Sequence, residues 1–152
     1  MSLFAVASLT AIVRHLRPGA MVAFQAPWFQ PPGGPFSHTK HAGACIIETF
    51  RRSGAHLDIG PGLHRIYVAA GLPLPQIRWE AVVDGAHDSP VCRSLIDTLE
   101  SVPPKAIEYG VASEGEFDLT TLAERIRFEM RFVGYAMPMA PLVAAWCRSS
   151  AA

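Results

Sequence analysis

The sequence predicts a mixed α/β fold, and three observations support this class. Residues 5–17 place apolar side chains at helical spacing and lead directly into an apolar segment at 20–26. Apolar and polar residues alternate over 77–83, which is typical of a strand, and a last apolar segment covers 141–147. Stretches with helical periodicity lie between these three predicted strands, and such alternation is typical of an α/β sheet.

The first predicted helix and strand meet at a proline–glycine turn. The apolar face of this helix consists of Leu9, Ile12, Val13 and Leu16. His15 and Arg17 fall in its expected last turn, where positive charge suits the negative end of the helix dipole. Pro18 cannot continue the helix, and Gly19 readily takes the positive φ of a tight exit. The strand that follows is apolar without alternation over 21–24, which predicts that both of its faces are covered.

Composition and charge exclude several classes of protein. The chain has 152 residues, of which 50% are hydrophobic and 17% charged, so intrinsic disorder is not expected. Thirteen basic residues balance thirteen acidic ones, which removes the electrostatic argument for a nucleic-acid partner. No apolar run reaches the length of a membrane span, and no basic segment of a secretory signal precedes the apolar N-terminus. The odd number of widely spaced cysteines predicts buried thiols in a reducing compartment, and hence a cytoplasmic protein: Cys45, Cys92 and Cys147.

Four further helices are predicted from apolar side chains at helical spacing, at residues 38–53, 61–71, 89–102 and 118 to about 132. Ser37 is expected to cap the first of them and Gly54 to end it. Pro103 and Pro104 are expected to stop the third, and residues 105–117 are predicted to be mostly loop.

Charged side chains in these helices are expected to face water. In the last helix, which Asp118 caps, the outward residues are Glu124, Arg125, Arg127, Glu129 and Arg131. Their mixed signs favour a solvated face and not an anion site. Glu48, Asp58 and Asp84 lack the spacing of paired catalytic carboxylates and are interpreted as solvated or capping groups.

Several segments of the chain resemble one enzyme family. The segment "RHLRPGAMVAFQ" resembles the lead into the fifth sheet strand of class I S-adenosylmethionine-dependent methyltransferases, most closely the small-molecule branch that includes the ubiquinone/menaquinone-biosynthesis type. The family usually has Gly where this chain has Ala20. "VAAGLPLPQIRWEAVV" resembles the segment that leads into the sixth strand. "FDLTTLAERIRFEM" and "PLVAAWCR" resemble the helix before the antiparallel seventh strand and that strand itself. The segments follow the order that they have in the family, and together they extend the resemblance over nearly the whole chain.

The resemblance implies the C-terminal part of a Rossmann-like methyltransferase sheet. It implies one partial domain over residues 1–152, with three strands, the last one antiparallel, and a helical insertion at 86–117 between the second and third strands. The cofactor half of the family has a G-x-G-x-G loop after its first strand. Here Gly60-Pro-Gly62 follows a helix, and the loop at Pro32–Pro35 lacks that spacing, so neither has the context of a cofactor loop.

The implied function is methyl transfer from S-adenosylmethionine to a small-molecule acceptor. By this interpretation the chain is truncated relative to the family, binds no cofactor alone and is inactive in isolation. A second copy or a partner chain would then supply the cofactor half. An alternative is a non-catalytic interaction module or pseudoenzyme that pairs through an exposed sheet edge, and a weaker one is a free-standing binder of apolar ligands. A parallel sheet cut in its middle exposes apolar surface, so the isolated chain is expected to dimerise, to aggregate or to be marginally stable.

The residues expected to bind the acceptor are Gln25, Trp28, Phe29, His38 and His41. The first three lie at the carboxyl end of the first strand, where open α/β sheets bind ligands. For the two aromatic residues, simple packing of the loop onto the sheet is an equal alternative. A neutral imidazole of His38 or His41 is suited to accept a proton from an acceptor hydroxyl. His38, His41 and Cys45 have the spacing of one helix face, but a metal site needs a further ligand. A polar helix start beside a buried thiol is therefore favoured over a metal site.

Overall fold

The computed structural model describes residues 3–30, 37–84, 88–113, 115, 119–132, 134 and 136–149. The chain divides into two compact units, each described by itself below. Unit 1 consists of Met1–Trp28, His56–Glu80 and Pro141–Ala152, and unit 2 consists of Phe29–Ala55 and Ala81–Ala140. The expected insertion at 86–117 is thus part of a longer unit, which also includes the segment after the first strand.

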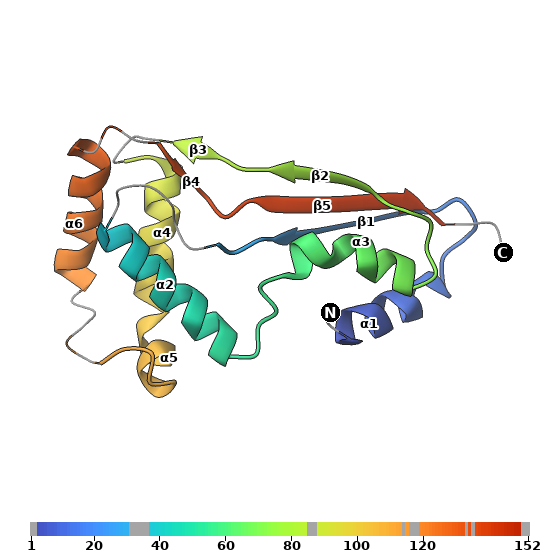
Figure 1. The fold of residues 1–152 in the computed structure, drawn as a ribbon, viewed down its shortest axis with the longest axis horizontal. Helices are drawn as coiled ribbons and strands as arrows, with labels where there is room; N and C mark the ends of the chain where they lie inside the picture. Colours follow the sequence, from blue (N-terminus) through green and yellow to red (C-terminus); the bar gives the residue numbers. More distant parts are fainter. Residues whose placement is uncertain are drawn as a thin grey trace. The chain divides into compact units, whose positions relative to one another are not determined.

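Unit 1 is built on a three-stranded sheet. Its strands are β1 (Met21–Pro27), β2 (Gln76–Glu80) and β5 (Leu142–Arg148), and their order in the sheet is β1-β5-β2 (Figure 1). The central strand β5 runs antiparallel to both neighbours, so β1 and β2 are parallel to each other. The expectation of a mixed α/β fold with three principal strands, the last antiparallel, is confirmed.

Two helices cover one face of this sheet (Figure 1). They are α1 (Leu3–Val13) and α3 (Ile59–Ala69), and α3 packs directly on β1 and β5. The buried core of unit 1 consists of Leu9, Val22, Leu63, Ile66, Tyr67, Ala70, Leu72, Val143, Ala145 and Cys147. Helical spacing over 61–71 predicted an apolar face for α3, and Leu63, Ile66 and Tyr67 are buried on it, as expected.

The prediction that both faces of the first strand are covered is wrong. Val22 is buried under the helices, but Met21, on the opposite face of the strand, is 53% exposed. Ala23 and Gln25, which alternate with Val22, are also exposed. An apolar run is compatible with a strand covered on both faces and with a strand covered on one face only. The composition of a strand does not show which other segments pack on each of its faces.

The first helix ends earlier than predicted. It stops at Val13, and His15 and Leu16 follow in a tight turn with backbone N–H groups donating to carbonyl oxygens three residues back. Because Arg17 precedes Pro18, the helical conformation is disfavoured there, and neither His15 nor Arg17 belongs to the last helical turn. The expected positive φ of Gly19 is confirmed at 76°.

A close approach at Gly60 sets the distance between α3 and the end of β1. A Cβ atom at Gly60 would lie 3.1 Å from the carbonyl oxygen of Ala26, 3.1 Å from Cγ2 of Val143 and 3.2 Å from the carbonyl oxygen of Pro27. The Gly60-Pro-Gly62 segment lies in the first turn of this helix and is not a strand-to-helix loop. Gly60 therefore serves helix–strand packing.

We expect Gly60→Ala to lower the free energy of unfolding by about 1–3 kcal/mol, since backbone oxygens cannot move away from the new methyl group. Gly62→Ala is the matched control, because its Cβ would meet only Cδ1 of Ile66 at 4.0 Å. This control should raise stability by about 0.5–1 kcal/mol through helix propensity. Urea unfolding followed by circular dichroism measures both, and equal effects at the two positions would contradict the close-approach argument.

Unit 2 is mainly helical. It contains α2 (Ser37–Arg52), α4 (Pro90–Ser101), α5 (Pro103–Glu108) and α6 (Leu119–Phe132), with a short pair of strands, β3 (Val83–Asp84) and β4 (Met137–Pro138) (Figure 1). Its buried core draws on all four helices and consists of Ala42, Cys45, Ile46, Val91, Cys92, Ile96, Leu99, Val102, Ala106, Leu122, Ile126, Met130 and Met137. The bounds of α2, α4 and α6 agree with the predicted helices to within one residue.

Two predictions for unit 2 are wrong. The loop expected over 105–117 contains most of α5, which begins with the Pro103-Pro104 pair that was expected only to end a helix. Proline has no N–H group to continue the hydrogen bonds of α4, so the pair ends that helix. The N–H groups of a first helical turn have no acceptor within the helix, so the same two prolines are tolerated at the start of α5. The strand expected over 77–83 ends at Glu80, and Val83 belongs to a separate pair of strands. The predicted cap Asp118 lies outside the described residues.

Candidate functional site

The face of the unit 1 sheet that the described helices α1 and α3 leave uncovered, called the bare face below, carries a shallow depression. It is lined by Met21, Ala23, Phe24, Gln25, Ala144, Ala145 and Trp146. The strand register places Ala23 opposite Trp146 and Gln25 opposite Ala144, so these four residues belong to one patch across β1 and β5. Apart from the indole N–H of Trp146, the Gln25 amide is the only polar side-chain group among the lining residues, and none of them is suited to acid–base chemistry. The depression therefore offers apolar contact and one orienting amide.

Trp28 lies just beyond the end of β1 and has a structural role. Its side chain is half-buried and packs against the core of unit 1. Its backbone N–H donates to the carbonyl oxygen of Pro141 at 2.8 Å, which ties the end of β1 to the start of β5. This packing is what the alternative interpretation of Trp28 expects, and its assignment to acceptor binding stays a prediction.

The other three predicted residues lie in unit 2, and they do not gather at one place. The ring of Phe29 meets the ring of Phe50 edge-on, with centroids 5.5 Å apart, near the C-terminal end of α2. His38 and His41 lie in the first turns of the same helix. Because Phe50 follows His38 by twelve residues, the two are separated by about 18 Å along the helix axis. Phe29 therefore does not lie beside the histidines, of which His38 is half-buried and His41 exposed.

A buried carboxylate is the best-defined polar group of unit 2. Oε1 of Glu129 accepts hydrogen bonds from Oγ of Ser37 at 2.8 Å and from the backbone N–H of His38 at 2.9 Å. Its Oε2 accepts from the backbone N–H and from Oγ1 of Thr39, both at 3.1 Å. Burial by itself raises the pKa of Glu129, but these four hydrogen bonds favour the charged form, and the net effect lowers it. The carboxylate caps α2 from another helix, where the helix dipole also favours negative charge.

This arrangement corrects two predictions. Glu129 was expected to face water, but only 9% of it is exposed. Ser37 was expected to cap α2 by accepting a hydrogen bond, but it is the first helical residue and its hydroxyl donates to Glu129. A signal for the buried position exists in the sequence, since Glu129 follows Leu122 by seven residues and Ile126 by three, on the apolar stripe of α6. The polar character of glutamate conceals this signal.

The three cysteines are buried and none forms a disulfide, as predicted. Burial raises the pKa of Cys92 and of Cys147, so both thiols stay protonated near neutral pH and are poor nucleophiles. Sγ of Cys45 lies 4.0 Å from Nε2 of His41. Among the described residues, no group of three or more His, Cys, Asp or Glu side chains is placed to hold a metal ion.

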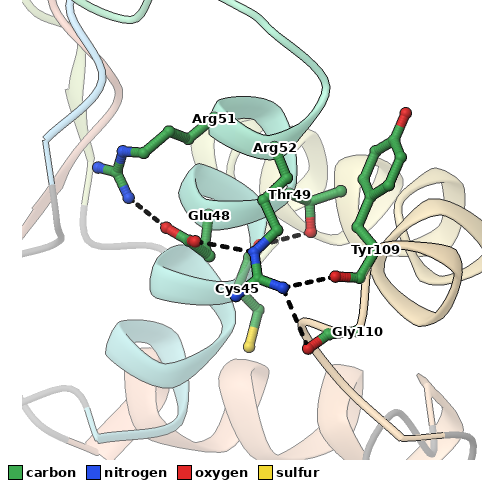
Figure 2. Close-up of polar contacts among 7 residues, drawn as sticks. All are labelled: Cys45, Glu48, Thr49, Arg51, Arg52, Tyr109 and Gly110. Carbon is green, nitrogen blue, oxygen red and sulfur yellow. Dashed lines mark hydrogen bonds and ion pairs between the residues drawn. The ribbon is translucent and has the colours of Figure 1, made fainter.

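A second polar cluster joins the end of α2 to the end of α5 (Figure 2). Arg51 and Arg52 both donate to the carboxylate of Glu48, with 3.0 Å between Nε of Arg52 and Oε1. Nη1 of Arg52 also donates to the carbonyl oxygen of Tyr109 at 2.5 Å and lies 3.4 Å from that of Gly110. The hydrogen bond from Arg52, and after it the smaller contribution of the hydrogen bond from Arg51, lowers the pKa of Glu48. Through Arg52 the cluster caps the C-terminus of α5, so we interpret its role as structural.

Within the described part of the chain, no helix combines the length and the apolar composition needed to cross a bilayer. Comparison of the sequence with protein-family models and with curated proteins gives no match.

Proposed function

We propose that this chain forms part of an S-adenosylmethionine-dependent methyltransferase and contributes the side that receives a small-molecule acceptor. The observation that carries the proposal is the sheet of unit 1. Two parallel strands, β1 and β2, flank an antiparallel last strand, and the helical segment precedes that last strand. This agrees with the parallel fifth and sixth strands and antiparallel seventh strand that the four sequence segments imply.

The proposal also accounts for the bare sheet face. A complete α/β domain covers both faces of its sheet, and in unit 1 the described helices cover only one. We therefore infer that another polypeptide segment covers the patch around Met21, Ala23 and Trp146 and supplies the cofactor site. No G-x-G-x-G segment with the required strand-to-helix context is present in the sequence itself.

Methyl transfer makes modest chemical demands on the acceptor side. The reaction is an in-line displacement at a sulfonium methyl group, so the protein has to position the acceptor and keep water away. The apolar lining of the depression suits water exclusion, and the Gln25 amide is suited to orient one polar group of the acceptor. The assignment of His38 or His41 as the base for an acceptor hydroxyl stays a prediction.

One observation favours the second candidate, a non-catalytic module that pairs through its sheet edge. Within the described residues, no strand pairs with the outer edge of β1, whose sequence MVAFQAP carries no charge. The opposite edge strand β2 carries Arg78 and Glu80, whose side chains form an ion pair at 2.6 Å. Charged side chains protect a strand edge from pairing with another chain. The edge at β2 is therefore protected, whereas the uncharged edge at β1 is open to pairing.

Calorimetry tests the first candidate, and light scattering tests the second. We expect no heat of S-adenosylmethionine binding to this chain alone, and tight binding would contradict the proposed absence of the cofactor site. If the chain is an edge-pairing module, light scattering should show a dimer, and Ala23→Lys should return it to a monomer because charge on an edge strand blocks pairing. Ala23 is exposed, so the fold should tolerate the change. A wild-type chain that stays monomeric at all concentrations would exclude self-pairing.

A further inference from the structure

Helix α6 of unit 2 exposes two aromatic rings on its outer face. Phe128 is 63% exposed and Phe132 is 65% exposed, and their ring centroids lie 4.4 Å apart. The opposite side of the helix packs in the core of unit 2 through Leu122, Ile126 and Met130. The helix therefore cannot rotate to hide the rings, and an exposed aromatic pair is typical of an interaction surface.

Arginine side chains flank these rings. Arg125, Arg127 and Arg131 are all exposed, and the guanidinium carbon of Arg131 lies 5.9 Å from the ring centre of Phe132. At 100° per residue, Arg125 lies on one flank of the ring pair and Arg131 on the other. None of the three forms a salt bridge with another described residue.

The burial of Glu129 makes this face basic. In the sequence, two glutamates alternate with three arginines and predict a neutral solvated face. In the structure, Glu129 is turned inward to cap α2, so Glu124 is the only acidic side chain left among the exposed residues of α6. The exposed residues of α6 then carry three positive charges against one negative charge, that of Glu124, which lies one turn before Phe128.

We propose that this outer face of α6, formed by Phe128, Phe132, Arg125, Arg127 and Arg131, binds an acidic segment of another protein. An apolar side chain of that segment packs on the two rings, and its carboxylates pair with the guanidinium groups, which bind carboxylates in a bidentate manner. Aromatic residues and arginines are the side chains most enriched at the centres of protein interfaces. The inference does not depend on the proposed methyltransferase function.

Two other occupants fit less well. Helices that lie on a membrane surface present an apolar face along most of their length, whereas here two rings occupy a face that is otherwise charged. A second copy of the chain would place three arginines against three arginines, which repels. The charge of the face thus points to an acidic protein partner.

The test uses the full chain and a fluorescein-labelled peptide with leucine at i, i+3 and i+4 spacing and glutamate elsewhere. We expect fluorescence anisotropy to show saturable binding that weakens with added salt, and no binding of the same peptide with lysine in place of glutamate. Phe128→Ser and Arg131→Glu should each weaken binding by about tenfold or more. Both residues are exposed, so the far-ultraviolet circular dichroism of each variant should match the wild type.

Arg93→Glu is the matched control, because Arg93 is an exposed arginine on α4 of the same unit, outside this face. It makes the same change in net charge and should leave the peptide affinity unchanged. An equal loss in Arg93→Glu would overturn the proposal by showing non-specific attraction. Binding to phosphatidylserine vesicles that Phe128→Ser abolishes, without binding of the acidic peptide, would overturn it in favour of a membrane. Self-association that Phe128→Ser abolishes would overturn it in favour of a second copy.

Discussion

Glu129→Ala is expected to lower the free energy of unfolding by about 2–4 kcal/mol at neutral pH, since it removes a helix cap and leaves buried donors without partners. The substitution takes away all four hydrogen bonds at the start of α2, among them those from the buried N–H and hydroxyl of Thr39. Urea unfolding followed by circular dichroism measures the loss. Glu124→Ala on the same helix is the control, because Glu124 is exposed, and it should change stability by no more than about 0.5 kcal/mol.

The pH dependence of this effect has a definite sign. The pKa of Glu129 is lower in the folded chain than its ordinary value of 4.5, so the folded state binds this proton more weakly than the unfolded state. The stabilisation is therefore fully present above the ordinary value and is lost as the pH falls through the lower, folded-state pKa. In Glu129→Gln the pH-dependent part of the stability that comes from this carboxylate should be absent. The difference in free energy of unfolding between wild type and variant should therefore shrink toward acid pH. A difference that stays constant down to acid pH would contradict the assignment.

Tyr67→Ala is expected to lower the free energy of unfolding by about 3–5 kcal/mol, as truncation of a buried aromatic side chain does. Tyr67 is 0% exposed in the core of unit 1, and its ring meets that of Phe24 edge-on at 6.3 Å. Its hydroxyl donates to the carbonyl oxygen of Ala145 at 2.7 Å. Burial raises the pKa of Tyr67 to about 12, so this hydroxyl remains a donor throughout the neutral range.

Tyr67→Phe separates the two contributions. It keeps the ring and removes the hydroxyl, so it should cost about 0.5–1.5 kcal/mol, the net value of one hydrogen bond. Val68→Ala is the matched control, because Val68 is the next residue of the same helix and is 48% exposed. Urea unfolding of the three variants gives the comparison. A loss in Tyr67→Ala no larger than that in Val68→Ala would show that unit 1 is not held by this core.

The candidate site was predictable only in part. The sequence places Gln25 near the carboxyl end of a strand, and the structure agrees, but which face of the strand is open depends on packing. The sequence leaves two roles open for Trp28, and burial favours the structural one. Glu129 and the exposed rings of Phe128 and Phe132 escaped prediction together. Residue type suggests charged outside and aromatic inside, whereas the packing of Leu122, Ile126 and Met130 turns Glu129 inward and leaves both rings exposed.

The sequence by itself determined the helices and strands whose signals are local. Apolar spacing set α2, α3, α4 and α6, and the turn at Gly19 followed from the φ that glycine allows. Only the tertiary structure decided that β5 lies between β1 and β2, that the described helices of unit 1 cover one face of this sheet, and that the Glu129 carboxylate caps α2. The reason is physical: hydrogen-bond partners and covering layers come from residues far away in the chain, and no local pattern of side chains encodes which distant segment will arrive.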